Sequence, residues 1–135
     1  MYSLLLSLFL FLQTPSVEGT WVNIDDETGV AKSEIELYVE QGKLYGRVLR
    51  LLLPEDQGKK CVNCKGKDQN KPIEGLLIVR GLSRENADWT DGKIMDPANG
   101  KSYDCTIQLE DPNTLNVRGF LGFSFLGRTQ VWKRK

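Results

Sequence analysis

The chain has 135 residues, of which 18 are Lys or Arg and 18 are Asp or Glu, so its formal net charge is zero. This length suits a single domain, and the absence of a basic excess argues against nucleic-acid binding, which needs clustered cations to neutralise phosphates. The chain contains no His, which excludes Ser–His–Asp and Cys–His catalytic pairs and His-ligated zinc.

The first 16 residues differ in composition from the rest of the chain. Residues 4–12 read LLLSLFLFL and are followed by QTPS. This apolar run is too short for a membrane-spanning helix, which takes about 20 residues, and small residues with a proline after it are typical of a secretory signal peptide. We expect residues 1–16 to be a signal peptide and residues 17–135 to be one secreted or periplasmic domain. The alternative is an apolar strand or helix of the domain itself.

From Gly19 onward, apolar residues alternate with polar ones at a period of two, which is typical of half-buried β-strands. In residues 33–40, SEIELYVE, the apolar side chains Ile35, Leu37 and Val39 share one face. Turn-forming sequences separate such runs. The pattern predicts eight strands, at residues 19–24, 33–40, 43–53, 73–80, 87–95, 101–109, 114–121 and 125–134.

This spacing predicts an all-β fold, an eight-stranded antiparallel up-and-down barrel, with a β-sandwich as the alternative. Closure would remove exposed strand edges. A barrel of this size is filled by side chains or holds one small ligand. The residues expected to line a ligand cavity are Ile35, Leu37, Val39, Leu44, Val48, Tyr103, Ile107, Val117, Leu121, Phe123 and Phe125.

The three cysteines are candidates for a disulfide, a redox pair or a metal site. Cys61 and Cys64 lie in a loop rich in Lys, Gly and Asp, and Cys105 lies on the apolar face of a strand. An exported protein favours one disulfide with one cysteine left over. A Cys61–Cys64 bond and a bond from either to Cys105 are both open; we favour Cys61–Cys64, because Cys105 shares its face with Tyr103 and Ile107. No metal site is expected, since zinc needs four ligands.

The connection expected between the last two strands, residues 119–127, has three Phe and two Leu among glycines. Glycine allows sharp bends and close approach. The segment is interpreted in three ways: as a hydrophobic lip over a ligand cavity, as ordinary core, or as an exposed docking patch.

Gly19-Thr20-Trp21 opens the first expected strand, and GRTQVWKR at residues 127–134 closes the last. This arrangement resembles the lipocalin and calycin pattern, which implies that an Arg of the last strand packs over Trp21 and seals one end of the barrel. Arg128 and Arg134 are the candidates, and we favour Arg128. A cation over an indole face contributes about 0.5–2 kcal/mol.

A longer series of motifs is more specific. It comprises DDETG at residues 25–29, GKLYG at 42–46, CVNC at 61–64, GKIMDPANGKSY at 92–103 and VRGFLG at 117–122. In this order, over nearly all of residues 19–134, the motifs resemble a family of small exported bacterial domains with a lipocalin-like barrel. The resemblance implies the fold and export, and it supplies no catalytic residue.

The sequence therefore predicts a non-enzymatic, exported, monomeric binding protein without a cofactor, which holds a small hydrophobic or amphipathic ligand in a barrel cavity. No nucleic-acid partner and no integral membrane segment after signal cleavage are expected. The alternatives are a protein-interaction domain that docks through residues 119–127 and a thiol-redox protein that uses Cys61 and Cys64.

Overall fold

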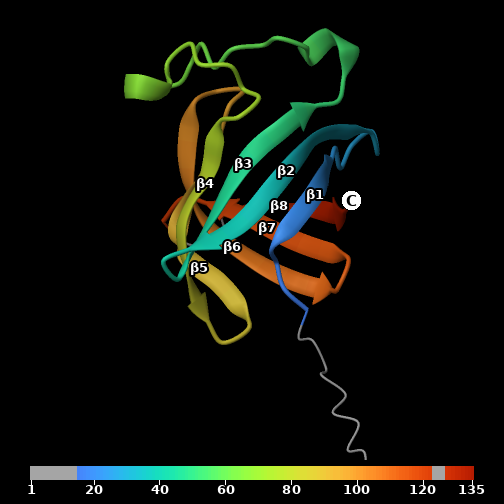
Figure 1. Ribbon diagram of the computed structural model, residues 1–135, viewed down its shortest axis with the longest axis vertical. Coiled ribbons are helices and arrows are strands. Elements are labelled where there is room, and N and C mark those ends of the chain that lie inside the picture. Colours follow the sequence, from blue (N-terminus) through green and yellow to red (C-terminus); the bar gives the residue numbers. More distant parts are fainter. Residues whose placement is uncertain (1–14, 123–126) are drawn as a thin grey trace, which may run out of the picture.

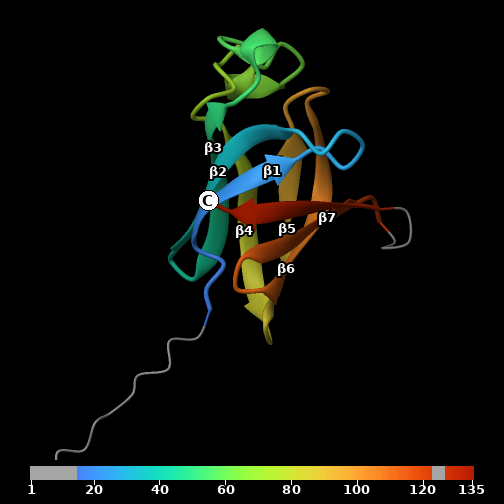
Figure 2. The same cartoon turned by 90° about the vertical axis from the view of Figure 1, so that its right-hand side faces the viewer.

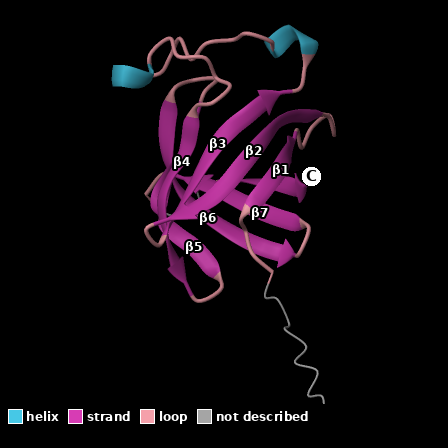
Figure 3. Ribbon diagram, viewed as in Figure 1, coloured by secondary structure: helices cyan, strands magenta, loops and turns pink. Residues whose placement is uncertain are grey.

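A computed structural model describes residues 15–122 and 127–135, which form eight antiparallel strands that close into a barrel in chain order (Figure 1). The predicted barrel is confirmed. Apart from two short 3-10 helices, the regular structure is all strand (Figure 3). The elements are β1 (Gly19–Ile24), β2 (Ala31–Glu40), β3 (Lys43–Leu51), η1 (Pro54–Asp56), η2 (Gly66–Asp68), β4 (Leu77–Glu85), β5 (Asp88–Asp96), β6 (Lys101–Asp111), β7 (Thr114–Phe120) and β8 (Arg128–Arg134).

One strand is displaced from its predicted place. The fourth strand was expected at residues 73–80, but β4 begins at Leu77, because a turn occupies the residues before it. The Leu76 amide donates to the Ile73 carbonyl at 3.0 Å, and Gly75 has a φ of 91°. Residues 52–76 thus form one long connection, which we call the strap.

Because neighbouring strands run in opposite directions, the connections alternate between the two ends of the barrel. Residues 41–42, 86–87 and 112–113 lie at one end, the closed end. Residues 25–30, the strap and residues 97–100 lie at the other end, the rim. Figure 2 shows the strap standing beyond the tips of β3 and β4. The predicted signal peptide, residues 1–16, lies almost entirely outside the described residues.

The barrel interior is filled by large apolar side chains. The pairing of β1 with β8, in which Trp21 faces Arg134, closes the cylinder around them. Gly46 shows how tightly they pack: a Cβ on it would lie 2.8 Å from Leu37 Cδ2 and 3.0 Å from Val79 Cβ. The largest fully buried side chains are Trp21, Trp132, Ile35, Leu37, Leu44, Leu82, Ile107, Leu115, Val79 and Val117.

Arg134, rather than Arg128, packs over Trp21, so that part of the sequence prediction was wrong. The guanidinium carbon of Arg134 lies 4.3 Å from the Trp21 ring centroid. Its nitrogens donate to the carbonyls of Pro112 at 2.9 Å, Glu18 at 2.9 Å and Ser16 at 2.6 Å. The two arginines share a strand face, but six residues of strand place them about 20 Å apart.

Arg128 lies near the rim instead, where its Nη2 donates to Asp26 Oδ1 at 2.7 Å. Both side chains of that pair are at least half exposed to solvent. The pair therefore joins the connection after β1 to the start of β8 on the surface of the molecule.

We expect Arg134→Ala to lower the free energy of unfolding by about 1–3 kcal/mol, because it removes charged hydrogen bonds and the cation over the indole. The matched control, Arg128→Ala, should cost less than about 1 kcal/mol, since it breaks only a surface ion pair. Urea denaturation of both variants measures the difference. Equal losses, or a larger loss for Arg128→Ala, would contradict this account of the closed end.

Candidate functional site

Most of the residues predicted to line a ligand cavity belong to the packed core. Six of them are buried among one another and the tryptophans: Ile35, Leu37, Leu44, Val48, Ile107 and Val117. Val39, two residues beyond Leu37 on β2, lies near the end of the strand with 37% of its surface exposed. These six side chains belong to one hydrophobic cluster in the barrel core.

Tyr103 and Leu121, in contrast, lie at the rim beside an open depression of about 460 Å³, which we call the rim pocket. Leu121 is 58% exposed. Phe123 and Phe125 lie outside the described residues, as do the other two residues of the 123–126 stretch in the hydrophobic hairpin predicted at residues 119–127. The rim pocket is lined by Cys64, Lys65, Asp68, Arg80, Met95, Gly100, Lys101, Ser102, Tyr103 and Leu121.

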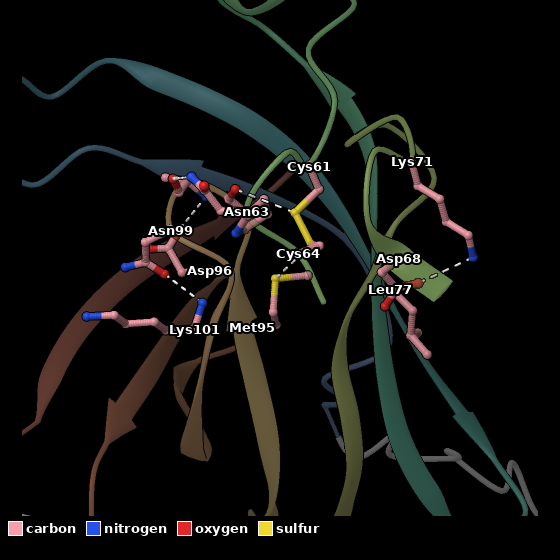
Figure 4. Close-up of a disulfide and its surroundings, with 12 residues drawn as sticks. Cys61, Asn63, Cys64, Asp68, Lys71, Leu77, Met95, Asp96, Asn99 and Lys101 are labelled. Carbon is pink, nitrogen blue, oxygen red and sulfur yellow. Dashed lines mark hydrogen bonds and ion pairs between the residues drawn. A yellow bond between two sulfur atoms is a disulfide. The ribbon is translucent and has the colours of Figure 1, made fainter. Parts of the chain in front are cut away.

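A disulfide between Cys61 and Cys64 forms the part of the strap that meets the barrel, which confirms the favoured pairing (Figure 4). Both cysteines are buried. Cys64 Sγ lies 3.7 Å from Met95 Sδ on β5, and Cys61 Sγ lies 3.6 Å from the Pro97 carbonyl oxygen. The disulfide is thus packed against the C-terminal end of β5 and the turn that follows it.

The strap holds this position through its own hydrogen bonds. The Cys61 amide donates to the Lys71 carbonyl at 2.8 Å, and the Asn70 amide donates to the Cys61 carbonyl at 2.9 Å. Lys60 and Pro72 form a β-bridge beside them. The two arms of the strap are therefore paired, which fixes where Lys65 and η2 lie relative to the barrel.

The turn between β5 and β6 receives the strap at Gly100. Gly100 has a φ of 71°, a conformation that favours glycine, and a Cβ there would lie 1.9 Å from the Asn63 carbonyl oxygen. Asn63 Nδ2 also donates to the Ala98 carbonyl at 3.2 Å. Close backbone approach at this glycine sets the wall of the rim pocket.

Gly100→Ala should separate the strap from this turn, because a side chain there collides with backbone. Gly29→Ala is a matched control, since Gly29 has the same φ of 71° but a Cβ added to it would meet nothing within 4 Å. Both changes carry backbone strain of about 1 kcal/mol, and Gly100→Ala should cost about 1–3 kcal/mol more. Thermal or urea denaturation measures this, and equal costs would contradict the docking contact.

Charge on the rim pocket is mostly positive. Its lining contains three cations and one acid: Lys65, Lys101 and Arg80, and Asp68. Asp68 is buried. Its Oδ2 accepts a hydrogen bond from Arg80 Nη2 at 2.5 Å, and its Oδ1 lies 3.3 Å from Lys71 Nζ. The hydrogen bond from Arg80 is the main reason that the pKa of Asp68 lies below its usual value, with Lys71 adding to it against the opposing effect of burial. Within the described part of the chain, Lys65 and Lys101 make no ion pair.

Cys105 lies apart from the pocket and is chemically quiet. It is buried in β6, and burial raises the pKa of its thiol to about 12. The thiolate, which is the nucleophile and metal ligand, is therefore scarce at neutral pH. Across residues 15–122 and 127–135, no group of three or more Cys, Asp or Glu side chains is placed to hold a metal ion.

We expect Cys105 to resist alkylation by iodoacetamide at pH 8 in the folded protein and to react fully in urea. Intact-mass spectrometry measures this. Because the disulfide is left unreduced, reaction of Cys105 appears as the mass of one added label. Rapid labelling under native conditions would contradict the buried position of the thiol.

The closed antiparallel barrel, with an Arg of the last strand over a Trp of the first, defines a lipocalin-like β-barrel. A solved structure of a Helicobacter pylori protein, described as belonging to the lipocalin family, is similar to this chain with a TM-score of 0.78 and 19% sequence identity. The similarity covers 90% of this chain and 84% of that one, and at this identity it concerns the fold.

The chain belongs to the family described as uncharacterized proteins conserved in bacteria (DUF2147), whose model matches residues 19–134. A search of curated proteins gave no match. None of the described helices is long and apolar enough to cross a membrane.

Seven of the pocket residues were not among the predicted site residues: Lys65, Asp68, Arg80, Met95, Gly100, Lys101 and Ser102. Lys65 follows directly after the CVNC motif and Asp68 lies three residues further on, so a search for charged side chains near the disulfide would have found them. Arg80, Met95 and Lys101 join the site only through tertiary contact with the strap.

Proposed function

We propose that this protein binds a small amphipathic molecule, and that the ligand lies in the rim pocket rather than in the centre of the barrel. The observation that carries this proposal is the rim pocket itself. It has a volume of about 460 Å³, within the range of about 300–1,000 Å³ that is usual for small-molecule sites.

Two kinds of surface meet in the pocket. Met95, Tyr103 and Leu121 offer apolar contact, and Lys65, Lys101 and Ser102 offer hydrogen-bond donors. A ligand with an apolar chain and a polar head would satisfy both, because burying either kind of group against the other is unfavourable. This combination favours an amphipathic ligand over a purely hydrophobic one.

The pocket is held in shape before a ligand arrives. The disulfide, the paired arms of the strap and the close approach at Gly100 fix its upper wall. A preformed site lowers the cost of ordering side chains and loops on binding. A rigid strap therefore supports a role in binding.

We further propose that the protein is exported and acts without catalysis. A buried disulfide suits an oxidising compartment, and the apolar run of residues 4–12 suits a signal peptide ahead of a domain at residues 17–135. In the pocket, Asp68 is engaged by Arg80 and Lys71, so it is suited to positioning cations rather than to taking up a proton.

Isothermal titration with a series of decyl amphiphiles tests the binding proposal. We expect one molecule to bind per chain, and Leu121→Asp to weaken binding at least tenfold, because it places a charge on the apolar wall. Val30→Asp is the control, since Val30 is also an exposed apolar residue, at 44%, and lies outside the pocket. Failure of every amphiphile to bind, or equal effects of the two substitutions, would overturn the proposal.

A further inference from the structure

Asp68 and Arg80 stand between two depressions. Both residues line the rim pocket, and both line a second depression of about 440 Å³, beneath the strap, whose other cations are Lys67 and Lys71. Their ion pair joins η2 of the strap to β4. The pair therefore borders both depressions.

The guanidinium of Arg80 is incompletely satisfied. Its Nη2 donates to Asp68 Oδ2 at 2.5 Å and to the Leu77 carbonyl at 3.2 Å. Its Nε is buried and has no hydrogen-bond partner among the described residues. A buried donor without an acceptor is costly, so this N–H is a position where a bound acceptor would be favourable.

Nε and Nη2 form one edge of the guanidinium, with two parallel N–H bonds. This edge matches the two oxygens of a carboxylate or phosphate, which then accept both bonds at once. Asp68 uses only one of the two. The Asp68 carboxylate therefore leaves one N–H of this edge without an acceptor, whereas a free oxyanion could accept hydrogen bonds from both.

The surroundings favour a negative ligand. Lys65 and Lys101 lie in the rim pocket, and Lys67 and Lys71 lie in the second depression, while Asp68 and Glu74 are the acids that line them. An excess of cations around a cleft raises the local concentration of anions. If Asp68 released Arg80, it would still have Lys71, whose Nζ lies 3.3 Å from Oδ1.

We propose that the ligand carries an oxyanion, a carboxylate or a phosphate, that binds the Nε–Nη2 edge of Arg80 in place of Asp68, while its apolar chain lies against Met95, Tyr103 and Leu121. This inference rests on the proposed function and specifies the chemistry of its ligand. Asp68 then acts as an internal competitor that holds Arg80 until the anion arrives.

The test is titration at pH 7 and constant ionic strength with decanoate, decyl phosphate, neutral decyl glucoside and decyltrimethylammonium, each below its micellar concentration. Decanoate or decyl phosphate should bind at least tenfold more tightly than decyl glucoside, and the cation should bind most weakly. The relative affinities of decanoate and decyl phosphate identify which oxyanion the fork prefers.

Three substitutions distinguish hydrogen bonding by the Nε–Nη2 edge of Arg80 from non-specific attraction of anions by positive charge. Asp68→Asn should raise the affinity for the anions several-fold, because the internal competitor is lost, and should leave decyl glucoside unchanged. Arg80→Lys keeps the charge but removes the fork, so it should abolish most of the anion preference. Lys93→Gln is the control: Lys93 pairs with Arg80 in the β4–β5 register but lies outside both depressions, so it should change little.

The outcomes are distinguishable. Equal binding of anionic and neutral amphiphiles, or an anion preference that survives Arg80→Lys, overturns the inference and leaves the proposed function standing. Binding by none of the four overturns the proposed function as well. Should Arg80→Lys unfold, as seen by its melting temperature, the Asp68→Asn titration decides alone: an unchanged anion affinity overturns the inference.

Discussion

The width of an eight-stranded barrel governs where this protein has room for anything else. Such a cylinder is only wide enough for side chains to fill it or for one small ligand to occupy it. Here Trp21 and Trp132 lie fully buried with leucine, isoleucine and valine side chains from β2, β3, β4, β6 and β7. The packing at Gly46, where a methyl group would already collide, shows that this level of the barrel is occupied. A depression is found instead at the rim, between the strap and residues of β4, β5 and β6.

The two ends of the barrel are finished in different ways. At the closed end, one side chain, Arg134, covers Trp21 and donates to three backbone carbonyls, so the last strand is tied to the connection between β6 and β7 and to the residues just before β1. At the rim, a long connection is folded on itself, closed by the Cys61–Cys64 disulfide and packed on the turn at Gly100. The first arrangement contributes stability, and the second leaves a preformed pocket with an apolar side and a cationic side.

Much of this fold could be predicted from sequence because strand periodicity and turn chemistry are local. Alternation in residues 33–40, the turn-forming sequences and the spacing of the runs were enough to predict the barrel. The apolar setting of Cys105 was enough to favour the Cys61–Cys64 bond. Local patterns misplaced β4, because Ile73 and Leu76 resemble apolar positions at the start of a strand, but residues 73–76 form a turn. They also could not separate Arg128 from Arg134, which share a face and differ only in register. Arg80, Met95 and Lys101 could not be predicted as site residues, since only the docked strap brings them together.

Methyl NMR of the full chain during titration with decanoate tests the central claim, that ligand occupies the rim and not the interior. Met95 is the one methionine of residues 17–135, and it lines the pocket. The account predicts saturable shifts of the Met95 and Leu121 methyl resonances, with those of the core residues Leu44 and Val117 left in place. Shifts confined to the core methyl groups, with Met95 unchanged, would contradict it.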